Sequence, residues 1–250
     1  HKIYLSCINA IPTDYSKGLS HVRGYLRRKI WDIERNFGWN FQFYSQAGQD
    51  KFVLQEFFKH KKNGFFVEIG AYNGIQGSNC FYFEKFKKWK GVAVEASPTQ
   101  FKSLKKNRSC LAINKAISDK NGTADFIDVT SGLTQMSGLE SDHYKKTYEK
   151  IKAGTSEINI IQAKTITLSS LFSTLKIKEI DYCSIDIEGG EYSIMKEFNF
   201  SKYPIKVLSF ENKEPEKIKF NSILEKNGYK FFDYVGSDEV WYNISHFDFS

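Results

Sequence analysis

The sequence predicts an α/β domain with a doubly wound, mostly parallel sheet. From about residue 45, short apolar segments alternate with segments whose apolar residues recur every three or four positions. This alternation is typical of parallel strands joined by helical crossovers. A second observation is the pair of aromatic segments 229–235 and 239–244, which a Gly236-Ser237-Asp238 turn separates. The pair predicts a C-terminal antiparallel hairpin at the edge of the sheet.

The expected strands are short and apolar, because strands of a parallel sheet are buried on both faces. They span residues 65–69, 91–95, 111–117, 124–129, 158–161, 182–187 and 207–210. The helices expected between them span residues 45–58, 78–86, 99–107, 168–175, 191–198 and 216–226. Residues 130–157 are polar, and an excursion of this length in a compact domain is more often functional than idle. Two similar triplets in this excursion, Ser131-Gly132-Leu133 and Ser137-Gly138-Leu139, predict a flexible lid over a site.

Composition limits the class of protein. Of the 250 residues, 41% are apolar and 26% are charged, which excludes a disordered or fibrous chain. No apolar run approaches the ~18 residues of a membrane span. The net charge of +7 favours anionic partners, although an ordinary solvated surface also carries such a charge. The scattered cysteines disfavour zinc and disulfides and predict a cytoplasmic location. Membrane association is a separate expectation, which rests on the basic N-terminal segment described next.

The first 43 residues differ from the rest, so we expect an N-terminal basic segment (1–43) before a domain that spans residues 44–250. Six basic residues lie between Lys17 and Arg35, and apolar residues recur there at helical spacing. Our first interpretation is an amphipathic helix docked on the body of the protein. The second is a surface that contacts a membrane or a partner domain. Because the chain starts at His1, we expect a trimmed start or a longer polypeptide.

A glycine turn with a preceding acid follows the first expected strand. The strand leads into Glu68-Ile69-Gly70-Ala71-Tyr72-Asn73-Gly74, an E-x-G-x-x-x-G pattern. Glycines allow a sharp turn and a close approach of backbone to ligand. A carboxylate at Glu68 would repel a diphosphate, so the pattern disfavours a dinucleotide. It favours a ligand with positive charge, and S-adenosylmethionine, which has ammonium and sulfonium groups, meets that requirement.

The second expected strand ends in Glu95, 27 residues after Glu68. A carboxylate at this position can accept hydrogen bonds from both hydroxyls of a ribose. Taken singly, the glycines are ordinary turn residues and Glu95 an ordinary acid at the end of a strand. Their joint occurrence on one strand–turn–helix–strand unit favours S-adenosylmethionine binding.

Several blocks of the chain resemble the FkbM-type S-adenosylmethionine-dependent methyltransferases. The resemblance runs from about residue 44 to the end, and its most specific block is Asp186-Ile187-Glu188-Gly189-Gly190-Glu191. The other blocks are 44–50, 66–79, 84–91, 95–98, 107–108, 116–119 and 209–212. The resemblance implies a Rossmann-like class I methyltransferase fold that binds the cofactor at the carboxyl ends of the strands.

The resemblance also implies which residues contact the cofactor. Residues 68–74 would hold its amino-acid part, Glu95 its ribose, and residues 116–119 would lie near the adenine. The full expected set is Gln46, Asp50, Glu68, Gly70, Ala71, Gly74, Asn79, Glu95, Ala96, Ser97, Ala116, Ile117, Ser118 and Asp186. Ala96-Ser97 stands where the family has Pro-Asn, which puts the packing around the adenine in doubt.

Acidic side chains follow the two expected strands that end opposite the methyl group. Transfer to a hydroxyl requires removal of its proton, so Asp186, Glu188 or Glu211 is a candidate general base. Alternatively, Asp186, Glu211 and Asn212 bind one Mg²⁺, which polarises the acceptor hydroxyl. A third interpretation is that the acids only stabilise the start of the next helix. His143, in the polar excursion, is a further candidate base, although a lone loop histidine is usually just solvated.

We therefore expect an O-methyltransferase that uses S-adenosylmethionine. The resemblance suggests a sugar or glycan hydroxyl as acceptor, on a surface polysaccharide, a glycolipid or a glycosylated product. A trimmed start also fits fusion to, or association with, glycosyltransferase domains, and we expect no nucleic-acid partner. The alternatives are an RNA or protein methyltransferase and a non-catalytic module that binds the cofactor. No N-P-P-Y-like motif of amine methylation follows the fourth strand, which argues against the first alternative.

Overall fold

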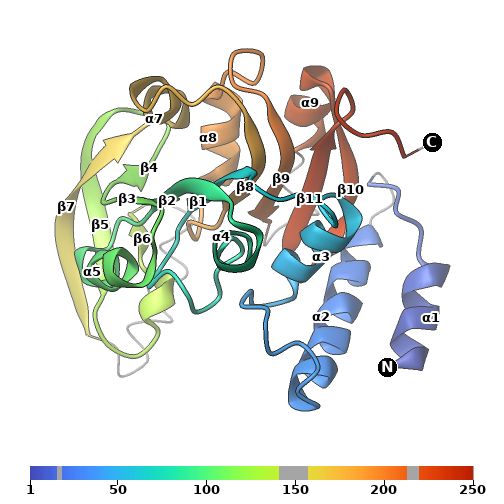
Figure 1. The fold of residues 1–250 in the computed structure, drawn as a ribbon. Helices are drawn as coiled ribbons and strands as arrows, with labels where there is room; N and C mark the ends of the chain where they lie inside the picture. The colour runs from blue at the N-terminus through green and yellow to red at the C-terminus, as the bar shows by residue number, and fades with distance from the viewer. Residues whose placement is uncertain (16–18, 141–156, 213–219, 250) are drawn as a thin grey trace.

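The computed structural model describes residues 1–15, 19–140, 157–212 and 220–249. Its centre is a seven-stranded sheet in the order β10-β11-β9-β8-β1-β2-β3 (Figure 1). The strands are β1 (Phe65–Ile69), β2 (Lys90–Val94), β3 (Leu111–Ile113), β8 (Ile180–Ile185), β9 (Ile205–Glu211), β10 (Tyr229–Val235) and β11 (Asp238–Asn243). Neighbours from β3 to β9 are parallel, and β11 is antiparallel to both β9 and β10. The expected doubly wound, mostly parallel sheet with a C-terminal antiparallel hairpin is confirmed.

The hairpin differs from the expectation in one respect, because its last strand lies inside the sheet and β10 forms the edge. Burial explains this order. Val240 and Trp241 of β11 are completely buried, whereas Lys230 of β10 is exposed. The apolar strand therefore occupies the position between two neighbours, where it loses the most contact with water.

Helices cover both faces of the sheet, and the two-residue alternation of the strands divides the core accordingly. One face packs Val67, Ile69, Cys183 and Ile185 against α7 (Leu168–Thr174), α8 (Glu191–Glu197) and α9 (Asn221–Leu224). The other packs Phe66, Tyr182 and Val207 against α3 (Gln49–Glu56) and α4 (Phe81–Lys87). On that same face, Ala93 contacts Leu104 of α5 (Pro98–Asn107).

A second, smaller sheet lies beyond β3, and the expected strand 111–117 is divided between the two sheets. The order of the small sheet is β4-β7-β5-β6, with β4 (Ala116–Ile117), β5 (Gly122–Val129), β6 (Gly138–Leu139) and β7 (Ile158–Ile166). The division falls at Asn114, whose side-chain amide donates to the carbonyl oxygens of Glu95 (2.8 Å) and Ala96 (3.0 Å). These bonds take the place of strand pairing, so the chain leaves the central sheet there. A 3₁₀ turn, η1 (Thr134–Met136), precedes β6, and η2 (Glu225–Asn227) follows α9.

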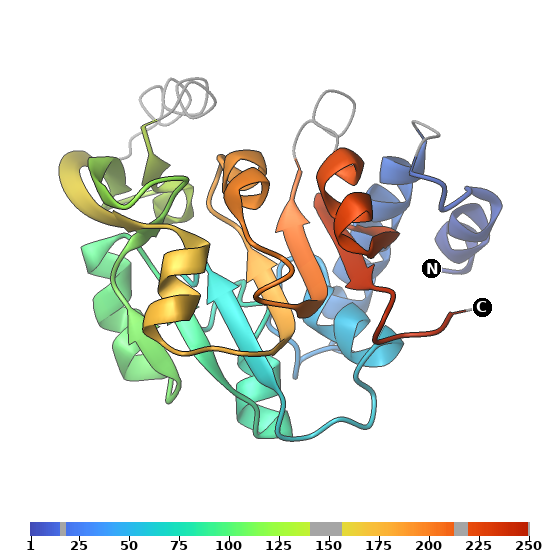
Figure 2. The same ribbon diagram turned by 90° about the horizontal axis from the view of Figure 1, so that it is seen from above.

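The N-terminal segment forms α1 (Lys2–Ala10), which the sequence did not predict, and α2 (Ser20–Asn36). Figures 1 and 2 place both helices at the β10 end of the central sheet, opposite the small sheet. Arg23 of α2 makes a buried, two-bond contact with Asp233 of β10, with both N–O distances 2.7 Å. A Cβ added at Gly24 would lie 2.1 Å from the carbonyl oxygen of Gly236, so α2 is in direct backbone contact with the turn between β10 and β11. These contacts agree with the first interpretation, a helix docked on the body. None of the helices in the described ranges is both long and apolar enough to cross a bilayer.

Candidate active site

The glycine turn after β1 is packed between β2 and β8. Gly70 has a φ of +79°, and an added Cβ would lie 1.7 Å from the carbonyl oxygen of Asp186. The amides of Gly70 and Ala71 both donate to the carbonyl oxygen of Val94, at 3.0 Å each. Gly74 also has a positive φ, +86°. No side chain fits at position 70, because the backbone of Asp186 fills the space that a Cβ would need, and Gly70 itself lines the cavity described below.

Glu68 is directed away from this turn. Its carboxylate accepts hydrogen bonds from Arg108 Nη1 (2.7 Å), Ser78 Oγ (2.7 Å) and the amide of Asn79 (2.8 Å). The positive charge next to Glu68 is therefore Arg108, which also bonds Glu84 through Nε at 2.5 Å. This buried pair fixes the start of α4 against β1. Contact of Glu68 with a cofactor stays a prediction, and its carboxylate does not line the cavity described below.

Glu95 lies at the end of β2 with both carboxylate oxygens oriented by the backbone. Oε2 accepts from the amide of Tyr72 and Oε1 from the amide of Ser97, both at 2.7 Å. Burial raises the pKa of Glu95 to about 7, and the nearby charge of Asp128 acts in the same direction. Because each carboxylate oxygen has two lone pairs, each can accept one further hydrogen bond. The group is placed to bind a pair of neighbouring hydroxyls.

A cavity of about 320 Å³ lies at the carboxyl ends of β1, β2 and β8. The residues that the sequence predicted and that line it are Gln46, Gly70, Ala71, Glu95, Ala96, Ala116, Ile117, Asp186 and Glu188. Cavities of this size hold small-molecule ligands, and the position at the ends of parallel strands is where such sheets bind them.

The cavity has further walls that sequence reasoning missed. They include Tyr72, Gln100, Lys115, Phe126, Thr134 and Leu139. The hydroxyl of Tyr72 lies 2.6 Å from Thr134 Oγ1, which joins the glycine turn to η1. The paired triplets at 131–133 and 137–139 were a usable signal for this wall, because they predicted a loop over the site. The central part of the polar excursion lies outside the described residues, so the lid itself stays a prediction.

Five other predicted cofactor residues do not line the cavity: Asp50, Gly74, Asn79, Ser97 and Ser118. The carboxylate of Asp50 accepts from Ser45 Oγ (2.5 Å) and the amide of Tyr44 (2.7 Å), so it shapes the loop before α3. Asn79 donates to Ser184 Oγ at 2.9 Å, and Ser97 caps α5 by accepting from the amide of Gln100. Asp50, Asn79 and Ser97 thus bond other residues of the protein, and direct contact of the five residues with a cofactor stays a prediction.

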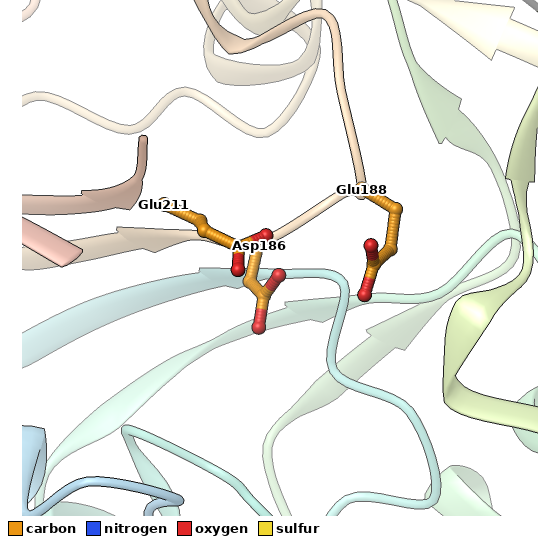
Figure 3. Close-up of side chains that lie close together, drawn as sticks. All are labelled: Asp186, Glu188 and Glu211. Atoms are coloured by element: carbon orange, nitrogen blue, oxygen red, sulfur yellow. The ribbon is translucent and has the colours of Figure 1, made fainter. Parts of the chain in front are cut away.

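Three carboxylates lie close together, as Figure 3 shows, and two of them, Asp186 and Glu188, line the cavity. Asp186, Glu188 and Glu211 each offer one oxygen, and these oxygens lie within 4.8 Å of one another. Asp186 directly follows β8, Glu188 lies in the next turn with a φ of +63°, and Glu211 ends β9. Burial, with the charges of Glu211 and Asp238, holds the pKa of Asp186 well above its usual range. We call these three residues the acid cluster.

Asn212, which the Mg²⁺ hypothesis included, is directed elsewhere. It is buried, its side-chain amide donates to Glu239 Oε1 at 2.7 Å, and its backbone amide donates to the carbonyl of Ser237. Glu188 takes its place beside Asp186 and Glu211, because the turn after β8 brings that carboxylate back to the sheet edge. His143 lies outside the described residues.

The model of the methyltransferase FkbM domain matches residues 68–231. The chain belongs to the FkbM methyltransferase family. The match includes Glu95 and the acid cluster, whereas the helices at the N-terminus lie outside it. A comparison with curated protein sequences gave no match.

Solved structures similar to this FkbM protein are distant ones. A methyltransferase from Pyrococcus furiosus is 16% identical, with 80% of this chain and 83% of that one covered and a TM-score of 0.38. The N-terminal domain of human METTL16 is 13% identical, with 80% of this chain and 67% of that one covered and a TM-score of 0.39. The Methanococcus jannaschii fibrillarin pre-rRNA processing protein is 13% identical, with 73% of this chain and 67% of that one covered and a TM-score of 0.36. Likeness at this level carries no information on substrate.

The class I methyltransferase fold implies S-adenosylmethionine binding, and the residues of the cavity fit that cofactor. The turn at Gly70 and Ala71 lines the cavity, so its backbone can contact the amino-acid part of a ligand. Glu95 has one acceptor position left on each oxygen for the ribose. The small side chains of Ala96 and Ala116 leave space along the wall for a flat adenine ring.

Proposed function

We propose that this methyltransferase transfers the methyl group of S-adenosylmethionine to a hydroxyl of a sugar or glycan. The observation that carries the proposal is the acid cluster, of which Asp186 and Glu188 line the cavity. A hydroxyl is a weak nucleophile until its proton is removed, and a carboxylate with a raised pKa is a stronger base than an ordinary one. The cluster therefore supplies what transfer to oxygen requires.

Each side chain has a distinct part in the proposed reaction. The backbone at Gly70 and the carboxylate of Glu95 orient the bound donor, which supplies an electrophilic methyl group on sulfonium. Asp186 accepts the proton of the acceptor hydroxyl while the hydroxyl oxygen forms the bond to the methyl carbon. The electrons of the broken carbon–sulfur bond remain on sulfur, so this leaving group needs no proton. Glu188 and Glu211 keep the pKa of Asp186 high by their negative charge.

The negative charge of the acid cluster disfavours a nucleic acid as the acceptor. A nucleic acid carries one negative charge per phosphate, and three carboxylates at the methyl end of the cavity would repel it. A sugar is neutral and rich in hydroxyls, so it meets no such repulsion. A non-catalytic module is the remaining alternative, and only turnover separates it from an enzyme.

The test is methyl transfer from labelled S-adenosylmethionine to a panel of mono- and oligosaccharides, with the Asp186→Asn variant beside the unmodified protein. We expect kcat to fall about 10²–10⁴-fold in the variant, the usual contribution of a general base. Binding of S-adenosylhomocysteine should change little. Asp125→Asn is a matched control, because this exposed aspartate lies on β5 in the small sheet. Methylation only of RNA or protein acceptors, or an unchanged kcat in Asp186→Asn, would contradict the proposal.

Mg²⁺ is the competing way to activate the hydroxyl, with the acid cluster as its oxygen ligands. The two mechanisms give opposite results after exhaustive EDTA treatment. With Asp186 as general base, activity survives the treatment. Loss of activity that added Mg²⁺ restores would replace this mechanism by a metal-assisted one and leave the proposed acceptor unchanged.

A further inference from the structure

Three large aromatic side chains are exposed within five residues after α2. Phe37 is 69% exposed, Trp39 58% and Phe41 83%. We call residues 37–41 the aromatic tip. Gly38, with a φ of +74°, allows the tight turn between the first two side chains. Large apolar side chains gathered in this way on a surface mark a site of interaction.

The aromatic tip is held in place by specific bonds. The amide of Trp39 donates to the carbonyl of Glu34 at 2.9 Å, and Arg35 Nη1 donates to the carbonyl of Phe43 at 3.1 Å. The ring of Phe43 is buried and stacks on Tyr82, with 4.5 Å between the centroids. The exposed rings therefore project from an anchored turn.

The start of α1 extends the same apolar surface. The rings of His1 and Trp39 meet edge to face at 6.0 Å, and those of Phe37 and Trp39 lie 5.6 Å apart. Ile3 is 77% exposed on the first turn of α1. In Figure 1 the N-terminus of α1 and the end of α2 lie at the same end of the molecule. Two segments thus contribute to one surface.

The charges around the aromatic tip are mainly positive. Lys2 follows His1, whose ring contacts Trp39, Arg35 precedes Phe37 by two residues, and both cationic side chains are exposed. The acids on the second half of α2 have cationic partners: Asp32 accepts from Arg28 at 3.0 Å, and Glu34 from Lys51 at 2.8 Å. Within the described residues, Arg35 has no carboxylate partner. An apolar surface with a cationic rim is complementary to a bilayer with anionic headgroups.

We propose that the aromatic tip docks on an anionic lipid bilayer. Trp and Phe side chains are favoured at the interface between water and hydrocarbon, and adjacent Lys and Arg bind anionic headgroups. A second copy of the chain fits the surface less well, since like charges around the two tips would oppose each other. The tip lies outside the matched FkbM domain, so this is a property of the N-terminal segment itself.

A groove connects the aromatic tip to the cofactor cavity. It is lined by Phe41, Arg35 and Tyr44, among others, and it shares Arg28 and Gln46 with the cavity. When the tip is docked, the groove would therefore face the bilayer. If the proposed glycan methyl transfer holds, the acceptor can be a sugar attached to a lipid, which reaches the acid cluster along this groove.

The experiment is co-sedimentation of the full chain with phosphatidylcholine vesicles and with vesicles that contain about one quarter phosphatidylglycerol. We expect binding to the anionic vesicles, with a blue shift of tryptophan fluorescence, and at least tenfold weaker binding of the triple variant Phe37→Ser/Trp39→Ser/Phe41→Ser. Arg35→Glu should weaken binding to anionic vesicles and lower the salt dependence of that binding, because an electrostatic contact with the headgroups is lost. Ile160→Ser is the matched control, because this side chain is 59% exposed on β7 of the small sheet, at the opposite end of the molecule from α1 and α2 (Figure 1), and its loss should leave binding unchanged.

Three results would overturn the docking proposal. The first is an unmodified protein that stays in the supernatant, and the second is a triple variant that sediments as well as the unmodified protein. The third is tip-dependent self-association in analytical ultracentrifugation without vesicle binding, which would make a second copy the occupant. Binding of S-adenosylhomocysteine reports folding of every variant. Because vesicle binding is measured without any acceptor, its failure is distinct from a failure of the methyl-transfer assay.

Discussion

Replacement of Glu95 by alanine is the most direct test of how the cavity binds its cofactor. Each oxygen of this carboxylate accepts one backbone amide at 2.7 Å and retains one acceptor position for a ribose hydroxyl. Hydrogen bonds to a charged group contribute about 1.5–3 kcal/mol, and we expect a loss of this size once the exposed amides are solvated. The dissociation constant of S-adenosylhomocysteine should therefore rise about 10–150-fold.

The pH dependence of binding supplies an independent check on the same residue. Burial raises the pKa of Glu95 to about 7, so the carboxyl is largely protonated at pH 6 and ionised at pH 8. The ionised form accepts the ribose hydroxyls more strongly. Affinity should therefore rise with pH through 7 in the unmodified protein, and this rise should be lost in Glu95→Gln.

Isothermal titration with S-adenosylhomocysteine at pH 6, 7 and 8 measures both effects. Glu56→Ala is the control, since Glu56 is exposed at the end of α3 and does not line the cavity. Circular dichroism of each variant separates lost binding from lost folding. An unchanged dissociation constant in Glu95→Ala would refute the assignment of the ribose to Glu95.

Three further predictions concern the turn, a buried acid and the N-terminal helix. Gly70→Ala should abolish cofactor binding in titration, because the new Cβ would lie 1.7 Å from a backbone oxygen; Gly228→Ala, at a similar φ of +80° in open space, should retain it. Burial raises the pKa of Glu239 to about 7, so its contribution to stability is present below the ordinary carboxyl pKa and lost as pH rises through 7. The melting temperature should fall from pH 5 to pH 8, and less steeply in Glu239→Gln. Arg23→Ala should lower the free energy of unfolding in urea by about 3 kcal/mol, because Asp233 loses a buried ion-pair partner; a loss below about 1 kcal/mol would place the pair among weak surface contacts.

The local pattern of the sequence was sufficient for the elements of the central sheet. The apolar strands and the helical periodicity between them agree with β1, β2, β8 and β9 and with α4, α5 and α8. The helix expected at 216–226 begins outside the described residues, and its described part is α9 followed by η2. The turn at Gly70 and the acid at Glu95 could be placed because each lies next to a strand end. Features of this kind depend on neighbours in the chain, so a sequence pattern records them.

Contacts between distant segments were beyond such a pattern. The positive partner of Glu68 is Arg108, 40 residues further on, and nothing in the local sequence distinguishes it from a positively charged ligand. The division of residues 111–117 between two sheets depends on the side chain of Asn114, and the acid cluster includes Glu188 because of the turn after β8. Helix α1 has no side-chain cap and one buried residue, so its local signal is weak.

The chain passes from the central sheet to the small sheet at Asn114, so the two sheets supply different walls of the cavity. Ala116, Phe126 and Leu139 form a wall of the cavity from the small sheet, whereas Gly70 and Glu95 belong to the central one. Changes of length between Thr134 and Leu139 can thus enlarge or narrow the cavity while Gly70 and Glu95 keep their positions. Engineering of acceptor scope should begin in residues 134–139 and leave Ala116, which lies in the wall assigned to the adenine ring, unchanged.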